Sequence, residues 1–263
     1  MPAKYRFEVS AYGCDFRIET SRQEDDDVLR RYVFPSWPRR EQFDERSGLT
    51  IRVHPMGAQV EMAVAEVSVA TAGSINDLMP ELTRVIDEAV IQQLKNLYAV
   101  HAGAVAWRNR VLLLPGGTHA GKSSLVAELL RHGATYFSDE YALIDPEGRV
   151  HPYPRALLVR GDNSQQSPLL ASELNAATGE APAPVGWIVA LQYRSDCAWS
   201  LTPVAQSEGL LTLLRNTPHI MEESPGLLGA FTRAVGGAVC YAGSRGEAGE
   251  AAGRLLQLFD QGT

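Results

Sequence analysis

Residues 101–140 read HAGAVAWRNRVLLLPGGTHAGKSSLVAELLRHGATYFSDE, and this stretch decides the fold. An apolar run, Val111–Leu114, leads directly into the glycine-containing segment Gly116–Ser123, and apolar residues at helical spacing follow it. A buried strand, a glycine-rich loop and a helix in immediate succession are the three parts of a phosphate loop. The sequence therefore predicts a strand, a phosphate-binding loop and a helix that starts at the loop.

The loop matches the Walker A pattern, GxxxxGK[ST], at every fixed position. Gly116 and Gly121 let the backbone curve around a polyphosphate, Lys122 would neutralise phosphate charge, and Ser123 offers a hydroxyl to Mg²⁺. The positive end of the following helix would face the phosphates. A glycine-containing turn with a chance lysine is the alternative. The expected cofactor-binding residues are Gly116, Gly117, Thr118, His119, Ala120, Gly121, Lys122, Ser123 and Ser124.

Composition narrows the class of protein. A chain of 263 residues with 45% hydrophobic residues can bury a core. A net charge of −7 argues against nucleic acid as a partner. Three widely spaced cysteines follow no metal-binding pattern, and neither a signal peptide nor an apolar run long enough for a membrane span is visible. We therefore expect a soluble cytoplasmic protein without a membrane partner.

The chain before residue 99 is predicted to be a strand-rich region with one long helix. Alternating apolar and polar residues predict strands in Tyr5–Glu19, Leu49–Val53 and Val60–Val69. The acidic run Glu24–Asp27 is typical of a solvated loop or a helix start. Apolar residues near a 3.6-residue period predict a helix over Met79–Leu97.

Two strands joined by a tight turn precede the phosphate loop. Val100–Trp107 is predicted as a strand, and Arg108–Arg110 turns the chain into the next one. In an ordinary phosphate-loop NTPase the strand before the loop belongs to a parallel sheet, so this hairpin favours a mixed sheet. We predict an α/β domain over residues 99–263 with the loop on a mixed sheet, rather than a doubly wound fold.

Beyond the loop the helix is expected to stop near Gly133, followed by short strands and a return to alternating helices and strands. Residues 161–184 show little apolar periodicity and are interpreted as a surface excursion over the site. The further predicted strands are Thr135–Phe137, Tyr141–Ile144, Val150–Arg160, Trp187–Tyr193 and Ala238–Ala242, and the further helices are Glu208–Leu214, Leu227–Val235 and Ala248–Phe259.

Three segments together resemble one family. His101 with residues 102–105, the loop 116–123 and the acidic pair after Ser138 match, in order and spacing, the C-terminal catalytic domain of bacterial HPr serine kinase/phosphorylase. The likeness is greater still to the shorter HPr-kinase-like proteins found beside peptide-modifying biosynthetic enzymes. The resemblance rests on specific residues over 101–160, whereas from 187 to 259 only the order of helices and strands is similar. It implies an HPr-kinase and phosphoenolpyruvate-carboxykinase type of fold.

The resemblance also implies roles for individual residues. Lys122 would bind the phosphates of ATP and Ser123 would hold Mg²⁺. Asp139 would act as the base toward an attacking hydroxyl, with Glu140 beside it near the metal, so Asp139, Glu140 and Ser123 form the expected metal set. His101 would help to orient the transferring phosphoryl group. The chemistry agrees, because phosphoryl transfer needs charge neutralisation and a positioned carboxylate more than covalent work by the protein.

The sequence departs from the family pattern at two places. Glu140 stands where the family usually has aspartate, and a longer carboxylate can still ligate Mg²⁺. Leu158 stands where a metal-binding glutamate precedes the Arg-Gly of true HPr kinases, which removes the basis for predicting phosphorylase activity. His119 is unusual inside such a loop, where small residues are the rule. Two roles are open for it: its side chain points outward, or it contacts the acceptor. Asp145 rivals Asp139 as a metal ligand, although the turn that follows it favours Asp139.

Five further residues carry weaker expectations. Arg215 and Arg245 are candidate phosphate or substrate contacts, whereas His54, His151 and His219 are interpreted as structural or surface residues.

These observations lead to one expectation and two alternatives. The expectation is an ATP- and Mg²⁺-dependent kinase that phosphorylates a hydroxyl, with serine in a peptide or small protein as the leading acceptor. A kinase for a small metabolite is the first alternative, and a nucleotide-binding module without transfer activity, serving a biosynthetic complex, is the second. The family's kinases also tend to form homo-oligomers, although no interface is evident in the sequence.

Overall fold

The computed structural model describes residues 3–37, 39, 43, 48–117, 120–160, 166–218 and 226–261. The chain forms two compact units. The first comprises Met1–Lys95 and Leu158–Leu170, and the second comprises Asn96–Leu157 and Ala171–Thr263. The sequence-based division placed all of 99–263 in one domain, whereas the contacts of the chain place residues 158–170 with the first unit.

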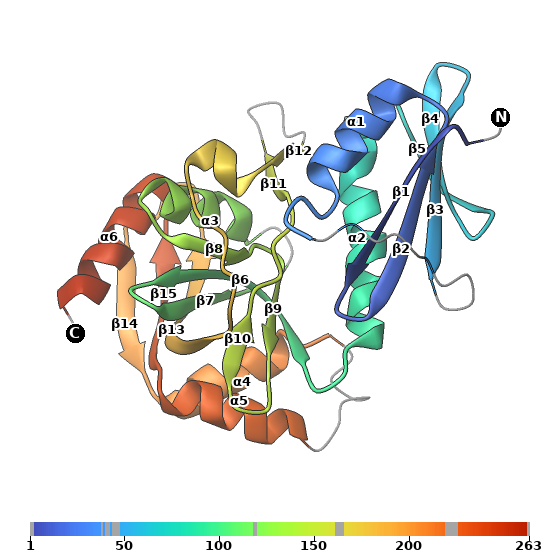
Figure 1. Ribbon diagram of the computed structural model, residues 1–263. Coiled ribbons are helices and arrows are strands. Elements are labelled where there is room, and N and C mark those ends of the chain that lie inside the picture. The colour runs from blue at the N-terminus through green and yellow to red at the C-terminus, as the bar shows by residue number, and fades with distance from the viewer. Residues whose placement is uncertain are drawn as a thin grey trace. The chain divides into compact units, whose positions relative to one another are not determined.

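The first unit is built on a five-stranded sheet with the order β1-β2-β3-β4-β5 (Figure 1). Its elements are β1 (Tyr5–Ala11), β2 (Cys14–Thr20), α1 (Gln23–Tyr32), β3 (Leu49–Met56), β4 (Gln59–Val64), β5 (Val67–Ala72) and α2 (Ile75–Gln93), and β11 (Leu157–Arg160) pairs with β12 (Gln166–Leu169) in a separate two-stranded sheet. β2 and β3 run parallel, while the other neighbours in the five-stranded sheet are antiparallel. The predicted strand-rich region is therefore a mixed sheet with two helices.

The pattern of side chains explains these strands. Cys14, Phe16, Ile18 and Thr20 of β2 are buried, while the residues between them are partly exposed, as expected for a strand with one face on a core. The acidic segment at the start of α1 is a helix start, as expected, but Asp25 and Asp26 are buried rather than solvated.

The long helix α2 begins four residues before the predicted start. The hydroxyl of Ser74 accepts a hydrogen bond from the backbone N–H of Asp77, so Ser74 caps a helix that starts at Ile75. The helix ends at Gln93, before the predicted end at Leu97. The periodicity located the helix, whereas the cap set its first residue.

The second unit contains the phosphate-loop segment and a larger sheet. Its elements are β6 (Tyr98–Trp107), β7 (Arg110–Pro115), α3 (Lys122–Arg131), β8 (Thr135–Ser138), β9 (Tyr141–Ile144), β10 (Arg149–His151), a 3₁₀ helix η1 (Ala171–Leu174), β13 (Ala183–Tyr193), β14 (Ser200–Val204), α4 (Gln206–Arg215), α5 (Gly226–Gly236), β15 (Val239–Arg245) and α6 (Ala248–Gln261).

The larger sheet is mixed. Its path is β10-β9-β6-β7-β13-β15-β14, with β8 paired to β6 and a further pairing between β10 and β13. β7, β13 and β15 run parallel, and the remaining pairs are antiparallel. The expectation of a mixed α/β architecture is confirmed. β14 was not predicted, and Pro203 within it fits an edge strand, where a missing backbone N–H costs least.

The predicted hairpin before the loop is present. β6 pairs antiparallel with β7, and Arg108 and Asn109 at its tip have φ values of 48° and 63°. Two consecutive left-handed residues are typical of a two-residue hairpin turn. β7 thus has antiparallel β6 on one side and parallel β13 on the other, so the carboxyl ends of β7, β13 and β15 meet at one edge of the sheet.

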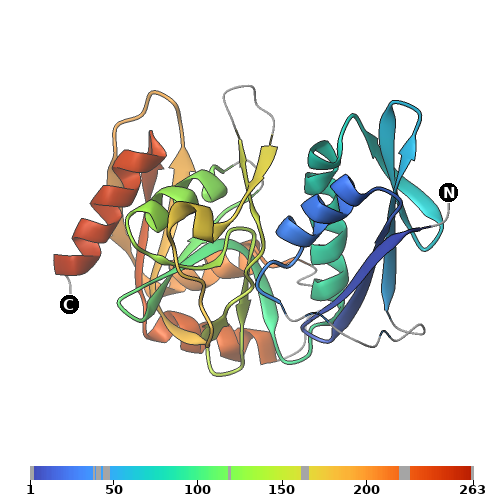
Figure 2. The same ribbon diagram turned by 45° about the horizontal axis from the view of Figure 1, so that its top comes forward.

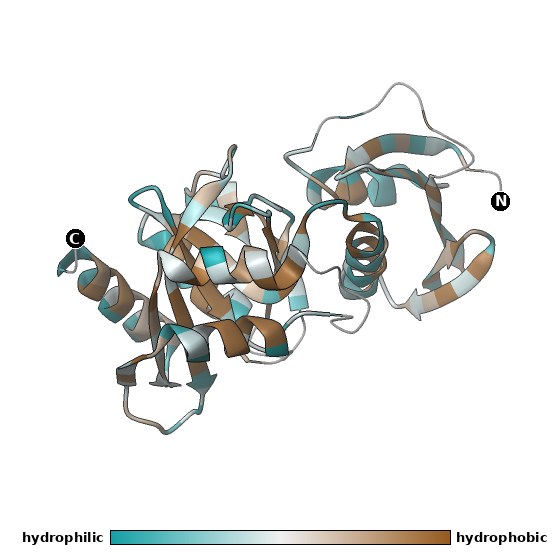
Figure 3. Ribbon diagram, turned by 90° about the horizontal axis from the view of Figure 1, so that it is seen from below, coloured by the Kyte–Doolittle hydropathy of each residue, from teal (hydrophilic) through white to brown (hydrophobic). Residues whose placement is uncertain are grey.

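Helices cover both faces of this sheet. Figures 1 and 2 show α3 and α6 on one face and α4 and α5 on the other. Gly103 of β6 permits the close approach of α3, because a Cβ there would lie 2.7 Å from Cγ2 of Val126. The strands between the helices are largely apolar, brown in Figure 3, and supply much of a core that includes Val100, Val111, Leu113, Ile144, Val185 and Ile188. No helix in the described ranges has the length and apolarity needed to cross a bilayer.

Candidate active site

The predicted phosphate loop connects β7 to α3. The backbone N–H of Gly116 donates to the carbonyl of His101, which ties the start of the loop to β6. Gly121 precedes the helix with φ of +73°, a left-handed conformation that glycine adopts with little strain. Ser123 and Ser124 are partly exposed in the first turn of α3. Thr118 and His119 lie outside the described residues.

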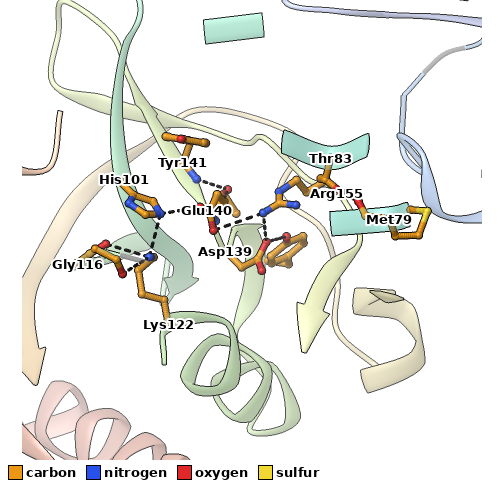
Figure 4. Close-up of polar contacts among 12 residues, drawn as sticks. Met79, Thr83, His101, Gly116, Lys122, Asp139, Glu140, Tyr141 and Arg155 are labelled. Carbon is orange, nitrogen blue, oxygen red and sulfur yellow. Dashed lines mark hydrogen bonds and ion pairs between the residues drawn. The ribbon is translucent and has the colours of Figure 1, made fainter. Parts of the chain in front are cut away.

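Lys122 is buried, with 8% of its surface exposed, and it turns back onto the loop. Its Nζ donates to the carbonyl oxygens of Gly116 at 2.9 Å and Gly117 at 3.0 Å, and it lies 3.1 Å from Nε2 of His101 (Figure 4). Burial lowers the pKa of Lys122, while the nearby carboxylates oppose that shift. The side-chain nitrogen of Lys122 is thus held against the backbone of Gly116 and Gly117 by contacts that a phosphate oxygen could replace.

His101 links this lysine to Glu140. Its Nε2 lies 2.6 Å from Oε1 of Glu140, and Figure 4 shows the three side chains in one line of contacts. Burial raises the pKa of Glu140, but the hydrogen bond from His101 and the charges of Arg155 and Lys122 outweigh it and bring the pKa to about 2. Because Glu140 is then ionised at neutral pH, its partner Nε2 is assigned as the proton donor.

Asp139 occupies different surroundings from its neighbour Glu140. The side chain is fully buried, and its Oδ1 accepts a hydrogen bond of 2.9 Å from the hydroxyl of Tyr136. Its Oδ2 is also buried and has no hydrogen-bond partner among the described residues. In contrast, 29% of the Glu140 side chain is exposed. Of the two expected carboxylates, Glu140 joins His101 and Lys122, while Asp139 lies on the buried side of the chain.

Arg155 was not expected from the sequence, and it lies beside both carboxylates. Its Nη2 is 3.5 Å from Oδ1 of Asp139 and 3.6 Å from Oε2 of Glu140, and the residue is 6% exposed. A buried arginine at these distances offsets the two negative charges. Its signal in the sequence is its position among Tyr153, Ala156 and Leu157, because an arginine within an apolar segment requires a charged partner when buried.

Asp145, the rival carboxylate, serves a turn. It accepts hydrogen bonds from the backbone N–H of Arg149 at 2.8 Å and from His151 at 2.9 Å, where the chain passes from β9 to β10. His151 therefore has the structural role expected for it. His54 is paired with Glu61 in the first unit, and His219 lies outside the described residues.

The two arginines named from the sequence are placed differently. Arg245 is 2% exposed, and its Nη2 donates to the carbonyl of Gly121 at 2.7 Å, so it contacts the loop from the protein side. Arg215 is exposed at the end of α4. Leu158 is buried in β11, where the apolar side chain fits its surroundings.

Comparisons with known proteins give likenesses among solved structures only. No protein-family model matches the sequence, and no curated protein matches it. Among the solved structures that resemble the chain is the Hpr(Ser) kinase/phosphatase from Coxiella burnetii, with 12% sequence identity and a TM-score of 0.32. The likeness covers 62% of this chain and 94% of that one.

Proposed function

We propose that this protein is a kinase that binds ATP with Mg²⁺ and transfers the γ-phosphoryl group to a hydroxyl. The observation that carries the proposal is the continuous contact from Lys122 through His101 to Glu140 at a complete phosphate-loop motif. Such a contact brings a cation for phosphate and a carboxylate for the acceptor or metal within one small region. Phosphoryl transfer depends mainly on this kind of positioning and charge neutralisation.

Lys122 supplies the phosphate contact. Its ammonium group now donates to two loop carbonyls, and phosphate oxygens would take their place when a polyphosphate enters the loop. His101 would then lie beside the transferring group, with its ring held by Glu140. This arrangement would give the terminal phosphate the ammonium group of Lys122 as a donor, with the ring of His101 held beside it.

The residues present also fit Mg²⁺. Hydroxyl and carboxylate oxygens are the ligands that this ion prefers, and the partly exposed Ser123 and Glu140 would provide them, with Asp139 as the buried third member of the expected set. The buried Oδ2 of Asp139, which lacks a hydrogen-bond partner among the described residues, is a further oxygen for a ligand to satisfy. When bound, Mg²⁺ would neutralise charge on the phosphates.

The two carboxylates would divide the remaining work. The family resemblance implied that Asp139 is the base toward the acceptor hydroxyl, but the complete burial of Asp139 favours Glu140 as the carboxylate that meets the acceptor. Asp139, together with Arg155, would then position Glu140. A carboxylate with a pKa near 2 abstracts a proton weakly, so its main contribution would be to orient the hydroxyl.

The acceptor is proposed to be a serine hydroxyl of a peptide or small protein, because the matching segments resemble HPr-kinase-like proteins that occur beside peptide-modifying enzymes. A small metabolite is the alternative acceptor. The enzyme is incubated with γ-labelled ATP and either serine-containing peptides or a panel of metabolite alcohols. The acceptor that carries the label distinguishes the two proposals.

Three variants test the mechanism. Lys122→Ala should abolish nucleotide binding, whereas Glu140→Gln and Asp139→Asn should retain it and lower the transfer rate, Glu140→Gln by at least about a hundredfold. Glu128→Gln, on the exposed side of α3, is the matched control and should behave as the wild type. Tight ATP binding with no transfer to any acceptor would leave the protein as a non-catalytic nucleotide-binding module.

If Glu140→Gln kept the wild-type transfer rate and Asp139→Asn lost it, Asp139 rather than Glu140 would be the carboxylate that meets the acceptor. Unchanged turnover in both variants would refute the transfer site itself.

A further inference from the structure

A cavity opens beside the phosphate loop, on the side away from the acidic residues. It has a volume of about 660 Å³, within the range of roughly 300–1,000 Å³ usual for small-molecule sites. All of its lining residues belong to the second unit. They come from the loop, from the carboxyl-terminal parts of β13 and β15, and from the end of α4, and they include Gly116, Gly117, Tyr193, Thr212 and Arg215.

The position of the cavity follows from the strand order. β7 carries the loop and lies between β6 and β13. His101 on β6, with Glu140 next to β9, lies on one flank of the loop, and the cavity lies on the other, β13 flank. The carboxyl ends of parallel strands are the usual place for ligands in open α/β sheets.

A triphosphate in this loop would therefore have its two ends on opposite flanks. Its terminal phosphate would lie near Lys122 and Glu140, where transfer is proposed. The other end of the phosphate chain, and the nucleoside attached to it, would leave the loop past Gly116 and Gly117 toward the cavity. An acceptor, in contrast, has to approach the terminal phosphate from the Glu140 side.

Tyr193 gives the cavity a surface suited to a base. It is an unusually exposed aromatic residue, 44% exposed, and it lines the cavity. The guanidinium of Arg245 packs on the ring of Tyr193, 5.1 Å from the ring centroid. The Cβ of Tyr193 would lie 3.8 Å from a Cβ atom added at Gly121, so Tyr193 is close to the loop. A ring held next to the loop is a stacking surface for a nucleobase.

The charged residues of the lining fit the rest of the nucleotide. Arg194 and Arg215 are exposed at the cavity and would attract the phosphate nearest the nucleoside. Thr212 and Asn216 add a hydroxyl and an amide, which match the hydrogen-bonding groups of a ribose. The backbone carbonyl of Asn216 accepts a 2.7 Å hydrogen bond from the N–H of His101, which ties this wall to the transfer side.

The geometry points to this cavity as the nucleoside subsite, with the base stacked on Tyr193 and the acceptor excluded from it. The inference rests on the proposed function in one respect, that the loop holds a nucleoside triphosphate. It adds that the protein recognises the nucleoside as well as the phosphates, through residues after position 190.

The test compares ATP with inorganic tripolyphosphate, which has the phosphates but no nucleoside. Thr212→Trp places a large side chain in the cavity, and Leu211→Trp, at the neighbouring exposed position outside the lining, is the matched control. By isothermal titration with Mg²⁺, Thr212→Trp should weaken ATP binding at least about tenfold and leave tripolyphosphate binding unchanged. Leu211→Trp should change neither, and circular dichroism checks that both variants fold.

A second pair of variants tests the stacking. Tyr193→Phe should keep the affinity for ATP, whereas Tyr193→Ala should lower it about tenfold, again without effect on tripolyphosphate. Equal loss of both ligands in Tyr193→Ala would mean that Tyr193 supports the loop rather than the base, and would overturn the assignment.

Wild-type protein that binds tripolyphosphate as tightly as ATP, or Thr212→Trp that binds ATP normally, would also overturn the nucleoside subsite. Failure of the proposed function gives a different result, because ATP would then bind with the predicted dependence on Tyr193 and Thr212 while no phosphoryl transfer occurs. If Lys122→Ala still bound both ATP and tripolyphosphate normally, the assignment of the phosphate loop would be refuted.

Discussion

Nη2 of Arg245 donates a hydrogen bond of 2.7 Å to the carbonyl oxygen of Gly121, and so joins the end of β15 to the predicted phosphate loop, 124 positions earlier in the chain. The same guanidinium donates to the carbonyl of Gly246 at 2.9 Å and packs on the ring of Tyr193. Gly121 has a positive φ and is the last residue before α3, so Arg245 holds the residue at which the chain enters the helix.

Replacing Arg245 with lysine should therefore weaken binding of both ATP and tripolyphosphate, by about tenfold each, because a single ammonium group lacks the two separate nitrogens that hold Gly121 and Gly246. The loss of buried hydrogen bonds should also lower the free energy of unfolding by about 1–3 kcal/mol. Arg254→Lys, which alters an exposed ion pair on α6, is the control and should change neither property. Isothermal titration and urea unfolding measure the two effects, and a variant with normal tripolyphosphate affinity would contradict the loop-supporting role.

Two glycine-to-alanine changes should shift stability in opposite directions. At Gly103 a Cβ would lie 2.7 Å from Cγ2 of Val126, so Gly103→Ala should lower the free energy of unfolding by about 1–3 kcal/mol. At Gly253, inside α6, a Cβ meets nothing within 4 Å, so Gly253→Ala should raise it by about 0.5–1 kcal/mol. Urea unfolding of both variants measures the difference, and a stabilised Gly103→Ala would show that α3 does not pack this closely on β6.

Glu140 should make stability depend on pH in the acid range. Its pKa falls from the ordinary 4.5 to about 2 on folding, so its ionised form is favoured in the folded state. That contribution, on the order of 3 kcal/mol, is fully present above about pH 4.5 and is lost as the pH falls toward 2. The wild type should therefore lose stability relative to Glu140→Gln as the pH is lowered from 5 to 3.

Urea unfolding at pH 7, 5, 4 and 3 measures this difference. Glu250→Gln, which alters an exposed ion pair with Arg254, should show no comparable trend. A difference between the wild type and Glu140→Gln that stays constant across this range would mean that Glu140 is not held by His101 and Arg155 in solution.

Arg155 should matter to both stability and transfer. Removing a buried cation leaves the charge of Asp139 uncompensated and that of Glu140 less well compensated, so Arg155→Met should lower the free energy of unfolding by about 3–5 kcal/mol. Combining it with Asp139→Asn should recover part of that loss, because one of the uncompensated charges is then removed. A double-mutant cycle by urea unfolding measures the coupling, and additive effects would show that the ion pair contributes nothing.

Much of the fold could be predicted because its signals are local. The hairpin turn at Arg108 and Asn109, the strand 111–114, the loop glycines and the helix after Lys122 each depend on neighbours in the sequence, and the structure places them as expected. β14 gave no such signal, since it is short and carries Pro203. The start of α2 depended on a single capping bond at Ser74 rather than on the apolar period.

Only part of the candidate site could be predicted from the sequence. The motif named Lys122 and Ser123, and the family resemblance named His101, Asp139 and Glu140. The motif did not show that Glu140 joins His101 while Asp139 turns into the core, because the two residues lie between β8 and β9, where the direction of a side chain follows no regular alternation. Arg155 was missed for a related reason, since its role depends on carboxylates that the fold, and not the sequence, brings near it.

A glycine-rich loop with a lysine, placed between a buried strand and a helix, could be predicted from residues 111–130 alone, because each of these elements depends on residues within one short segment. Only the tertiary structure decided what surrounds the loop. The strand order places His101 and Glu140 on one flank, and Tyr193, Arg215 and the supporting Arg245 come from segments at least 70 positions later. Strand pairing and core packing decide which of these distant segments become neighbours. Such pairing cannot be recognised within any one short segment of the sequence.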